Sequence, residues 1–361
     1  MKTSKTTTSA ALRIGPHTAR NFGRPLMIAE LGSNHNGKMD IARKLIDSAK
    51  SAGADYVKFQ SWSKDTIFSK KVYEDNYFVA DDYRNRKDFT LEKIVEEYSI
   101  SETQLLEMRQ YCDKVGIGFA STPFSEREVD FLVDKLRADF VKIASMDLNN
   151  YVFLDYVARK GKPIILSTGL STLAEIDKAV ATIERAGNRQ LAILHCVANY
   201  PPRDENLNLN NIDMLRDNFP DYPIGFSDHS LGSPIPLAAV AKGACILEKH
   251  FTLDKQMEGW DHKISATEGE LKEIIDGSAR IAAALGSYRR EITEDDLARI
   301  PSFRRSIVAA RAIAKGQQIT RADLDLKRPG TGIEPQYVSW IIGKVAKREI
   351  AYDQILQAED F

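Results

Sequence analysis

Two histidines in the second half of the chain have the spacing of a paired metal site. His229 and His250 each end a short strand-like run, PIGFSDH and CILEKHF, and about one helix length of sequence separates the runs. In a βαβ unit these strands would be parallel neighbours, so both imidazoles would lie at the same edge of the sheet. With Asp228 and Glu248 beside them, they would hold a divalent cation with open coordination positions. On these residues alone, a pair of ordinary strand-end histidines held by hydrogen bonds is an equally open alternative.

The sequence that positions these histidines repeats a strand-and-helix pattern. Apolar runs bounded by turn residues predict strands at residues 25–31, 55–60, 116–122, 138–145, 162–169, 191–197, 223–229 and 245–251. Most of them are separated by helical patterns, and together they occupy roughly 260 residues, which predicts a (β/α)8 TIM barrel over residues 25–286. An open doubly wound sheet is the alternative, but no GxGxxG follows the first strand.

Polar side chains recur at the C-terminal ends of these predicted strands, where barrel enzymes place their active sites. The set is Glu30, Lys58, Gln60, Thr122, Lys142, Ser145, Ser167, Thr168, His195 with Tyr200 just beyond it, Ser227, Asp228, His229, Glu248 and His250. Two lysines among several hydroxyls suit an oxygen-rich anion such as a phosphate with a neighbouring carboxylate. Each lysine standing alone would equally suit a salt bridge at the barrel mouth. A buried Lys58 or Lys142 with a depressed pKa would also suit a Schiff-base aldolase.

The rest of the chain divides into smaller segments. Residues 1–24 form a polar tail and cap in which residues 12–16 are expected to make a strand or hairpin. The insertion at residues 61–99 is long, aromatic and charged, which favours an ordered lid. Residues 287–303 are charged and predict a linker, whereas residues 304–361, with short β-like runs and many turns, predict a separate small β-rich domain.

The bulk composition narrows the class of protein. The chain has 361 residues, 50 Lys and Arg and 51 Asp and Glu, so its net charge of −1 does not indicate a non-specific nucleic-acid binder. No apolar run approaches the roughly 18 residues needed to span a bilayer, and the polar N-terminus lacks the hydrophobic segment of a secretory signal. Cys112, Cys196 and Cys245 lie in apolar runs without paired spacing. We therefore predict a cytoplasmic protein with no nucleic-acid or membrane partner.

Eight motifs in order resemble those of the sialic acid synthase family. They are IAELGSNHNG, ADYVKFQ, FASTPFS, FVKIAS, PIILSTG, LHCVANYP, GFSDHS and ILEKHFT. A ninth, LKRPGTGI, resembles the C-terminal antifreeze-like (SAF) domain of those enzymes, so the resemblance covers residues 26–361. The family condenses phosphoenolpyruvate with an N-acylhexosamine, giving a nine-carbon 2-keto sugar acid and phosphate.

The resemblance implies roles for individual residues. Positions that hold phosphoenolpyruvate match Lys58, Thr122, Lys142, Ser145, Ser167 and Ser227. Positions near the sugar and the reacting centre match Glu30, Gln60, Tyr200 and Asp261. Of these two sets, Glu30, Lys58, Lys142 and Asp261 are the predicted catalytic residues. His229 and His250 match the ligands of a divalent metal, manganese or magnesium. Arg328 matches an arginine that one subunit inserts over the barrel of the other, which implies a domain-swapped homodimer.

The resemblance also implies a mechanism. The metal acts as a Lewis acid on the aldehyde oxygen of the open-chain sugar, and C3 of phosphoenolpyruvate attacks the aldehyde carbon. Water, activated on the metal or by a carboxylate such as Glu30, adds at C2, and phosphate then leaves through C–O cleavage. A Schiff-base pyruvate aldolase and a non-catalytic saccharide-binding barrel remain the alternatives.

Two departures from the family pattern leave the sugar open. In HCVANYP, Asn199 is displaced by one position, and Gly259–Trp260 replaces the usual glycine–proline before Asp261. N-acetylmannosamine and a 2,4-diacetamido hexose of the legionaminic or pseudaminic type are both compatible with these residues.

Overall fold

The computed structural model describes residues 10–76, 90–287 and 289–361. The chain divides into two compact units, Met1–Gly286 and Ser287–Phe361, and each is described by itself. Within the described residues, no helix combines the length and apolarity required to cross a bilayer. Cys112, Cys196 and Cys245 are all buried and unbridged.

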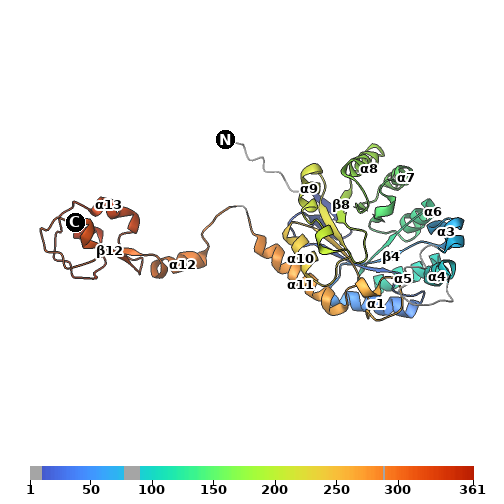
Figure 1. The fold of residues 1–361 in the computed structure, drawn as a ribbon, viewed down its shortest axis with the longest axis horizontal. Helices are drawn as coiled ribbons and strands as arrows, with labels where there is room; N and C mark the ends of the chain where they lie inside the picture. The colour runs from blue at the N-terminus through green and yellow to red at the C-terminus, as the bar shows by residue number, and fades with distance from the viewer. Residues whose placement is uncertain (1–9, 77–89, 288) are drawn as a thin grey trace. The chain divides into compact units, whose positions relative to one another are not determined.

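Eight parallel strands form the centre of the first unit (Figure 1). They are β3 (Leu26–Gly32), β4 (Tyr56–Gln60), β5 (Gly118–Thr122), β6 (Val141–Ile143), β7 (Ile164–Ser167), β8 (Leu191–Cys196), β9 (Ile224–Asp228) and β10 (Ile246–His250). Their order in the sheet is β5-β4-β3-β10-β9-β8-β7-β6, and β5 and β6 at the two ends of this order lie in contact. The predicted (β/α)8 barrel is confirmed, and each predicted strand matches an observed one within a few residues.

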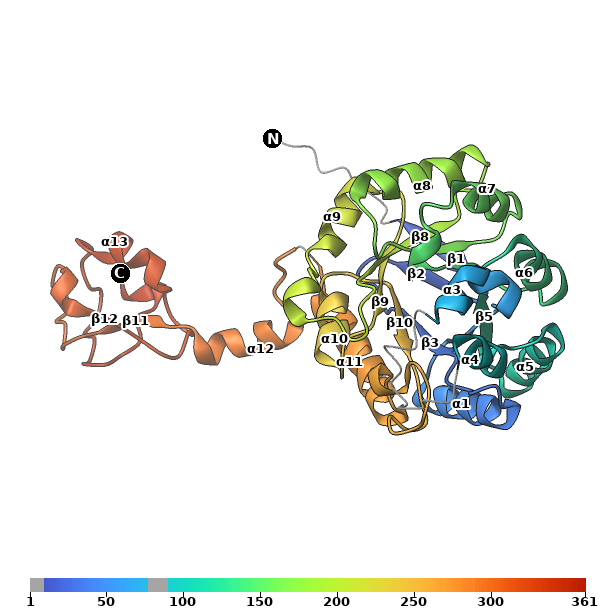
Figure 2. The same ribbon diagram turned by 45° about the vertical axis from the view of Figure 1, so that its right-hand side comes forward.

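Helices follow the strands and form an outer ring around them (Figure 2). They are α1 (Met39–Ala52), α5 (Glu102–Val115), α6 (Glu126–Asp130), α7 (Tyr151–Arg159), α8 (Leu173–Arg185), α9 (Asn211–Asn218), α10 (Pro234–Ala241) and α11 (Glu268–Leu285). A π-helical turn, Phe131–Lys135, follows α6 directly. Thr172 caps α8, since its side chain accepts a hydrogen bond from the backbone N–H of Glu175.

The barrel interior begins with an apolar layer that a hairpin closes at the N-terminal end. Strands β1 (Ala11–Ile14) and β2 (His17–Arg20) pair antiparallel, and their Leu12 and Ile14 are buried with residues from the barrel strands. The hairpin expected near residues 12–16 is therefore present. Gly225 on β9 shows how tight this interior is, because a Cβ there would lie 2.4 Å from the Leu194 side chain.

The insertion after β4 carries three short helices, α2 (Lys64–Ile67), α3 (Lys70–Asp75) and α4 (Leu91–Tyr98). A separate hydrophobic cluster holds it together, formed by Trp62, Leu91, Ile94, Val95 and Tyr98, and Trp260 of the loop after β10 packs against this cluster. The described parts of the insertion are thus ordered and apolar inside. Residues 77–89, which belong to the predicted lid, lie outside the described residues.

The second unit has its own small core. Strands β11 (Ser306–Ala309) and β12 (Leu324–Lys327) pair antiparallel, and one short helix, α13 (Val338–Ile341), contributes Ile341 to the buried cluster. The segment predicted as a linker contains a helix, α12 (Glu294–Phe303), whose N-cap Thr293 accepts a hydrogen bond from the backbone of Asp296. None of the side chains of α12 is buried, and its charged sequence predicted a linker instead of a helix.

Candidate active site

The polar residues at the C-terminal strand ends form one layer of the barrel interior. Side chains alternate between the two faces of a strand, so a residue two positions after an interior residue also points inward. The interior apolar residues include Ile28, Tyr56, Ala120, Phe140, Ile165 and Ile246. Two positions further along the same strands are Glu30, Lys58, Thr122, Lys142, Ser167 and Glu248. The interior of the barrel therefore changes from apolar to polar and charged over two residues along each of these strands.

The first lysine of this layer is held by β3, β5 and β10. Lys58 makes an ion pair with Glu30 and donates a hydrogen bond to the hydroxyl of Thr122 at 2.7 Å. Its ammonium also lies 3.8 Å from one carboxylate oxygen of Glu248. Only 3% of Lys58 and 1% of Glu30 are exposed, so this charge pair is almost fully removed from water.

The second lysine is held from the opposite side of the same carboxylate. Lys142 donates to the hydroxyl of Ser167 at 2.7 Å and to the carbonyl of Ile143 at 2.9 Å. Its ammonium lies 3.6 Å from Glu248, whose other contact is a hydrogen bond from Ser227 at 3.1 Å. Glu248 therefore stands between two buried lysines that come from different strands.

Burial and charge shift the pKa values of these groups in different directions. Burial raises the pKa of Glu30 to about 7, although the Lys58 ammonium opposes this shift. Burial also lowers the pKa of Lys142, and Glu248 only partly offsets it. For Lys58 the neighbouring carboxylates of Glu248 and Glu30 outweigh burial, so its pKa lies above the ordinary value.

Glu248 lies at the strand end where it was expected, but its partners differ from the expected ones. It was expected beside the histidines as a metal neighbour, whereas the structure places its carboxylate between Lys58 and Lys142. The local sequence contains one signal for this, since Glu248 and His250 are two apart and so share the interior face of β10. Its oxygen Oε2 is buried and accepts no hydrogen bond.

The two histidines lie together at the same end of the barrel. The ring centroids of His229 and His250 are 5.3 Å apart. His229 Nδ1 lies 2.9 Å from the carbonyl of Val197, which fixes Nδ1 as the protonated nitrogen and leaves Nε2 with a free lone pair. His250 Nδ1 is buried and has no hydrogen-bond partner, and the nearest carboxylate oxygen, of Asp261, is 3.6 Å away.

These observations fit a divalent metal held by two imidazoles. Burial pushes the pKa of His250 well below its ordinary value, so the ring is neutral, as a metal ligand must be. An orphaned, buried imidazole nitrogen is also costly unless something binds it. Across residues 10–76, 90–287 and 289–361, no group of three or more His, Cys, Asp or Glu side chains is arranged to hold an ion. The protein would thus supply two ligands and leave the remaining positions to water or substrate.

Asp228 does not join the histidines, and that expectation is wrong. Its carboxylate pairs with Lys249 at 2.7 Å and accepts a hydrogen bond from the backbone N–H of Ser230 at 2.8 Å. Asp228 and Lys249 face each other on neighbouring strands, on the opposite face of β10 from Glu248 and His250. This buried ion pair holds the backbone directly after His229 and so orients the histidine indirectly.

The residues expected near the sugar surround the histidines and Glu30. Gln60 donates a hydrogen bond to Glu30 at 3.1 Å. A Cβ added at Gly32 would lie 3.2 to 3.5 Å from atoms of Glu30, Gln60 and Asp261, so these three side chains converge on one point. The ring of Tyr200 lies over His229 with a centroid separation of 4.1 Å. Burial raises the pKa of Asp261 to about 6, although His229 opposes this shift.

The remaining predicted site residues fall into two groups. Ser145, in a short 3-10 turn after β6, accepts a hydrogen bond from the backbone N–H of Gly169 at 3.0 Å, so it lies beside the end of β7. Ser227 points at Glu248, as described above. Arg328 belongs to the second unit, where its guanidinium lies 5.2 Å from the ring centroid of Phe303.

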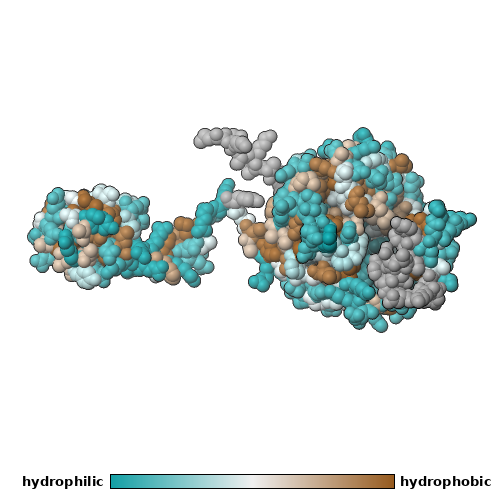
Figure 3. All heavy atoms as spheres, in the orientation of Figure 1, coloured by the Kyte–Doolittle hydropathy of each residue, from teal (hydrophilic) through white to brown (hydrophobic). Residues whose placement is uncertain are grey.

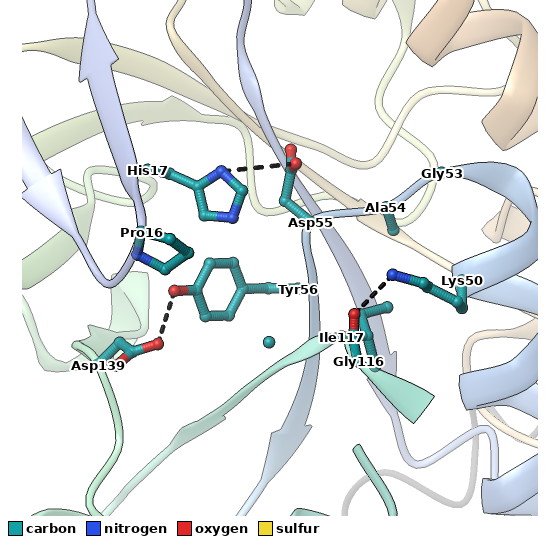
Figure 4. A pocket seen from close by; sticks show the side chains of 11 residues that line it. Pro16, His17, Lys50, Gly53, Ala54, Asp55, Tyr56, Gly116, Ile117 and Asp139 are labelled. Carbon is teal, nitrogen blue, oxygen red and sulfur yellow. Dashed lines mark hydrogen bonds and ion pairs between the residues drawn. The ribbon is translucent and has the colours of Figure 1, made fainter. Parts of the chain in front are cut away.

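The opposite end of the barrel also has a polar cavity, of about 370 Å³ (Figure 4). There Tyr56 donates to Asp139 at 2.7 Å and Lys50 donates to the carbonyl of Gly116 at 2.5 Å. Asp55 accepts hydrogen bonds from Arg24 at 3.2 Å and from the backbone N–H of Met27 at 2.8 Å. Because these groups satisfy one another, the cavity is not the candidate active site despite its size.

Comparisons with known proteins agree with the architecture. A model described as the NeuB family matches residues 45–290, and a SAF domain model matches residues 304–361. An uncharacterised protein of Methanocaldococcus jannaschii is 40% identical over 97% of this chain and 98% of its own length. The N,N'-diacetyllegionaminic acid synthase of Legionella pneumophila is 38% identical over 88% of this chain and 89% of its own. The crystal structure of N-acetylneuraminic acid (sialic acid) synthetase from Leptospira borgpetersenii, in complex with citrate, is 31% identical with a TM-score of 0.72, covering 81% of this chain and 95% of that one.

Proposed function

This chain belongs to the NeuB family and carries a C-terminal SAF domain, and from that premise we propose that it is a sialic acid synthase-type transferase. It condenses phosphoenolpyruvate with an N-acylhexosamine, giving a nine-carbon 2-keto sugar acid and phosphate. The observation that carries the proposal is the pair of buried lysines, Lys58 and Lys142, bonded to hydroxyls on the same barrel face as two adjacent histidines.

The lysines and hydroxyls are the anion-binding part of the site. Lys142 with Ser167, and Lys58 with Thr122, present ammonium and hydroxyl donors from four neighbouring strands. Ser145 and Ser227 add hydroxyls at the edges of this group. Such donors suit the phosphate and carboxylate of phosphoenolpyruvate, and they stabilise the negative charge that collects on phosphate as it leaves.

The reaction needs a proton acceptor near the attacked carbons. C3 of phosphoenolpyruvate attacks the aldehyde carbon of the open-chain sugar, water adds at C2, and phosphate leaves through C–O cleavage. Glu30 takes the proton from water, because a carboxylate with a pKa of about 7 can both accept and return a proton near neutral pH. Gln60, Tyr200 and Asp261 surround the same region and orient the sugar.

We further propose that His229 and His250 bind Mn²⁺ or Mg²⁺. The metal supplies Lewis-acid polarisation of the aldehyde oxygen of the sugar. The neutral ring of His250 and the fixed tautomer of His229 support this role, as does the orphaned Nδ1 of His250.

A domain-swapped homodimer, with Arg328 supplied to the partner barrel, is part of the proposal. Hydrophobic side chains are exposed on the second unit (Figure 3), among them Tyr337, Trp340 and Val345, of which about half of each surface is accessible. Exposed apolar groups of this kind suit contact with another subunit. Arg328→Ala is expected to raise the KM for the sugar far more than the KM for phosphoenolpyruvate, and an equal rise in both would contradict the role in trans.

A Schiff-base pyruvate aldolase is the second candidate, because burial lowers the pKa of Lys142. The Lys142 ammonium, however, donates hydrogen bonds to Ser167 and to the carbonyl of Ile143, and it lies near Glu248. Borohydride in the presence of pyruvate, and EDTA, separate the two functions. If EDTA left activity intact while borohydride with pyruvate abolished it, the synthase proposal would be lost.

The sugar is tested with a panel of N-acylated hexosamines. Purified protein with phosphoenolpyruvate and Mn²⁺ is expected to release phosphate with N-acetylmannosamine or with a 2,4-diacetamido hexose, and not without a sugar. Phosphate release that was the same for every sugar and for none would contradict the condensation.

A further inference from the structure

The side chain of Trp62 lies directly behind the candidate active site, at the start of the insertion after β4. It is 4% exposed, and its indole N–H donates a hydrogen bond to Oε1 of Gln60 at 2.9 Å. Gln60 in turn donates from Nε2 to Oε1 of Glu30 at 3.1 Å. Trp62, Gln60 and Glu30 thus form one chain of hydrogen bonds that ends at the proposed proton acceptor.

The chemistry of the three groups fixes the direction of this chain. An indole N–H can only donate, so the amide of Gln60 must turn its oxygen towards Trp62. The NH2 group of the same amide then faces Glu30, which accepts. Without the indole, the amide oxygen would lose its partner in a part-buried position, and the side chain would be free to rotate away from Glu30.

The backbone on either side of Trp62 is held in place as well. Ser61 donates its backbone N–H to the carbonyl of Thr122 at 2.9 Å, and its hydroxyl bonds that of Ser121. On the other side, the Trp62 ring packs at 6.0 Å from the ring of Trp260, the residue before Asp261. Trp62 therefore touches both the Gln60 amide and the loop that carries Asp261.

We propose that Trp62 is a positioning residue, which acts through Gln60 to hold the sugar side of the site in its working geometry. This inference rests on the proposed function, because Gln60 and Glu30 matter for turnover only if this is the site. It assigns to the insertion a part in catalysis that differs from covering the barrel. The proposed phosphoenolpyruvate site consists of Lys142 with Ser167 and Lys58 with Thr122, whereas the hydrogen bond of the Trp62 indole goes to Gln60, so the two substrates should respond differently.

The test is Trp62→Phe, which keeps the aromatic packing and removes only the N–H. With Mn²⁺ and the preferred sugar, kcat/KM for the sugar is expected to fall about tenfold, the worth of one hydrogen bond of about 1.4 kcal/mol. The KM for phosphoenolpyruvate is expected to stay within about twofold.

The matched control is Tyr73→Phe, which removes the hydrogen bond from Tyr73 to the carbonyl of Lys64 in the same insertion. It should leave kcat/KM for the sugar and the KM for phosphoenolpyruvate within about twofold.

A double variant separates positioning from general packing. In a Gln60→Leu background, Trp62→Phe is expected to cause less than about a twofold further loss, because the amide through which it acts is gone. Full additivity of the two changes would overturn the proposal. So would a Trp62→Phe protein with unchanged kcat/KM, or one in which the constants for both substrates fell equally.

A spectroscopic arm keeps this test apart from the proposed function itself. The chain has three tryptophans, so its indole N–H signals are few, and the signal lost in Trp62→Phe belongs to Trp62. That signal is expected to shift in Gln60→Leu, and an unshifted signal would overturn the inference whatever the activity. A shifted signal in a protein that turns over no sugar would support the contact and count against the proposed function instead.

Discussion

The two ends of the barrel use similar residues in opposite ways. The N-terminal end has Lys50, His17, Tyr56, Asp55 and Asp139, and the hydrogen-bonding groups of this set bond one another or nearby backbone. At the C-terminal end all of Lys58, Lys142, Glu30, Glu248 and His250 are buried, yet polar atoms of Glu30, Glu248 and His250 remain without hydrogen-bond partners.

This difference indicates which end binds a ligand. Polar atoms that are buried without partners destabilise a fold by about 1 to 3 kcal/mol each, so they are retained where a bound molecule completes them. The cavity at the N-terminal end, by contrast, is lined by polar groups that already have partners. Matched substitutions at the two ends of the barrel test this difference.

The largest effect is expected from the lysines. Lys142→Met should reduce turnover by about a thousandfold, because one of the donors that stabilise the leaving phosphate is lost. Lys50→Met at the other end should change turnover by less than about twofold. Steady-state phosphate release measures both, and equal losses in the two variants would remove the distinction between the ends.

The histidines provide the second comparison. His250→Ala should lower turnover by at least about a hundredfold and remove bound metal, since half of the proposed protein ligands are lost. His17, at the other end, is half-buried and lies 3.7 Å from Asp55. His17→Ala should leave turnover and the amount of bound metal unchanged. Metal content by mass spectrometry and activity before and after EDTA are the measurements. A His250→Ala protein that kept its metal and its turnover would contradict the assignment.

The pH dependence tests Glu30 alone. Burial raises the pKa of this carboxyl to about 7, so turnover that needs the carboxylate should rise with pH through about 7. Glu30→Gln should remove this limb of the profile and lower kcat about tenfold or more. An unchanged acid limb in Glu30→Gln would assign the titration to another group.

The raised pKa of Glu30 also makes the free energy of unfolding depend on pH. The folded protein binds the Glu30 proton more tightly than the unfolded chain, whose pKa is near 4.5, so the free energy of unfolding should decrease as pH rises from about 4.5 to 7. Glu30→Gln should show a smaller decrease in urea unfolding across that range. A larger decrease in the variant would contradict the raised pKa.

The smallest effect is expected at the paired end. Tyr56→Phe removes the hydrogen bond to Asp139 and should lower the free energy of unfolding by about 1 kcal/mol. Turnover at saturating substrate should stay within about twofold. Activity lost without a change in urea unfolding would mean that this end also takes part in function.

The barrel itself could be predicted because each strand is buried on both faces and therefore reads as an apolar run. The alternation of side chains then placed Lys58, Lys142 and His250 inside, since their positions relative to the ends of the runs are local information. The roles of these residues come from the family resemblance and stay predictions, whereas their contacts at one end of the barrel are observed.

The side-chain partners on neighbouring strands could not be predicted from the sequence. Glu248 and Asp228 are both acidic residues near strand ends, yet Glu248 lies between two buried lysines and Asp228 is neutralised by Lys249. Which of them meets which lysine depends on the register of β9 against β10 and on closure of the barrel. The contact of Trp62 with Gln60 is hidden for the same reason, because it needs the insertion to fold against the loop after β10.

The proposed condensation is tested most directly with phosphoenolpyruvate labelled with ¹⁸O in the oxygen that bridges C2 and phosphorus. With an accepted N-acylhexosamine and Mn²⁺, we expect phosphate to appear only in the presence of sugar, to carry the label, and to form in a one-to-one ratio with the keto acid. Unlabelled phosphate, or release that did not depend on the sugar, would show that the lysine and histidine cluster does not perform the proposed condensation.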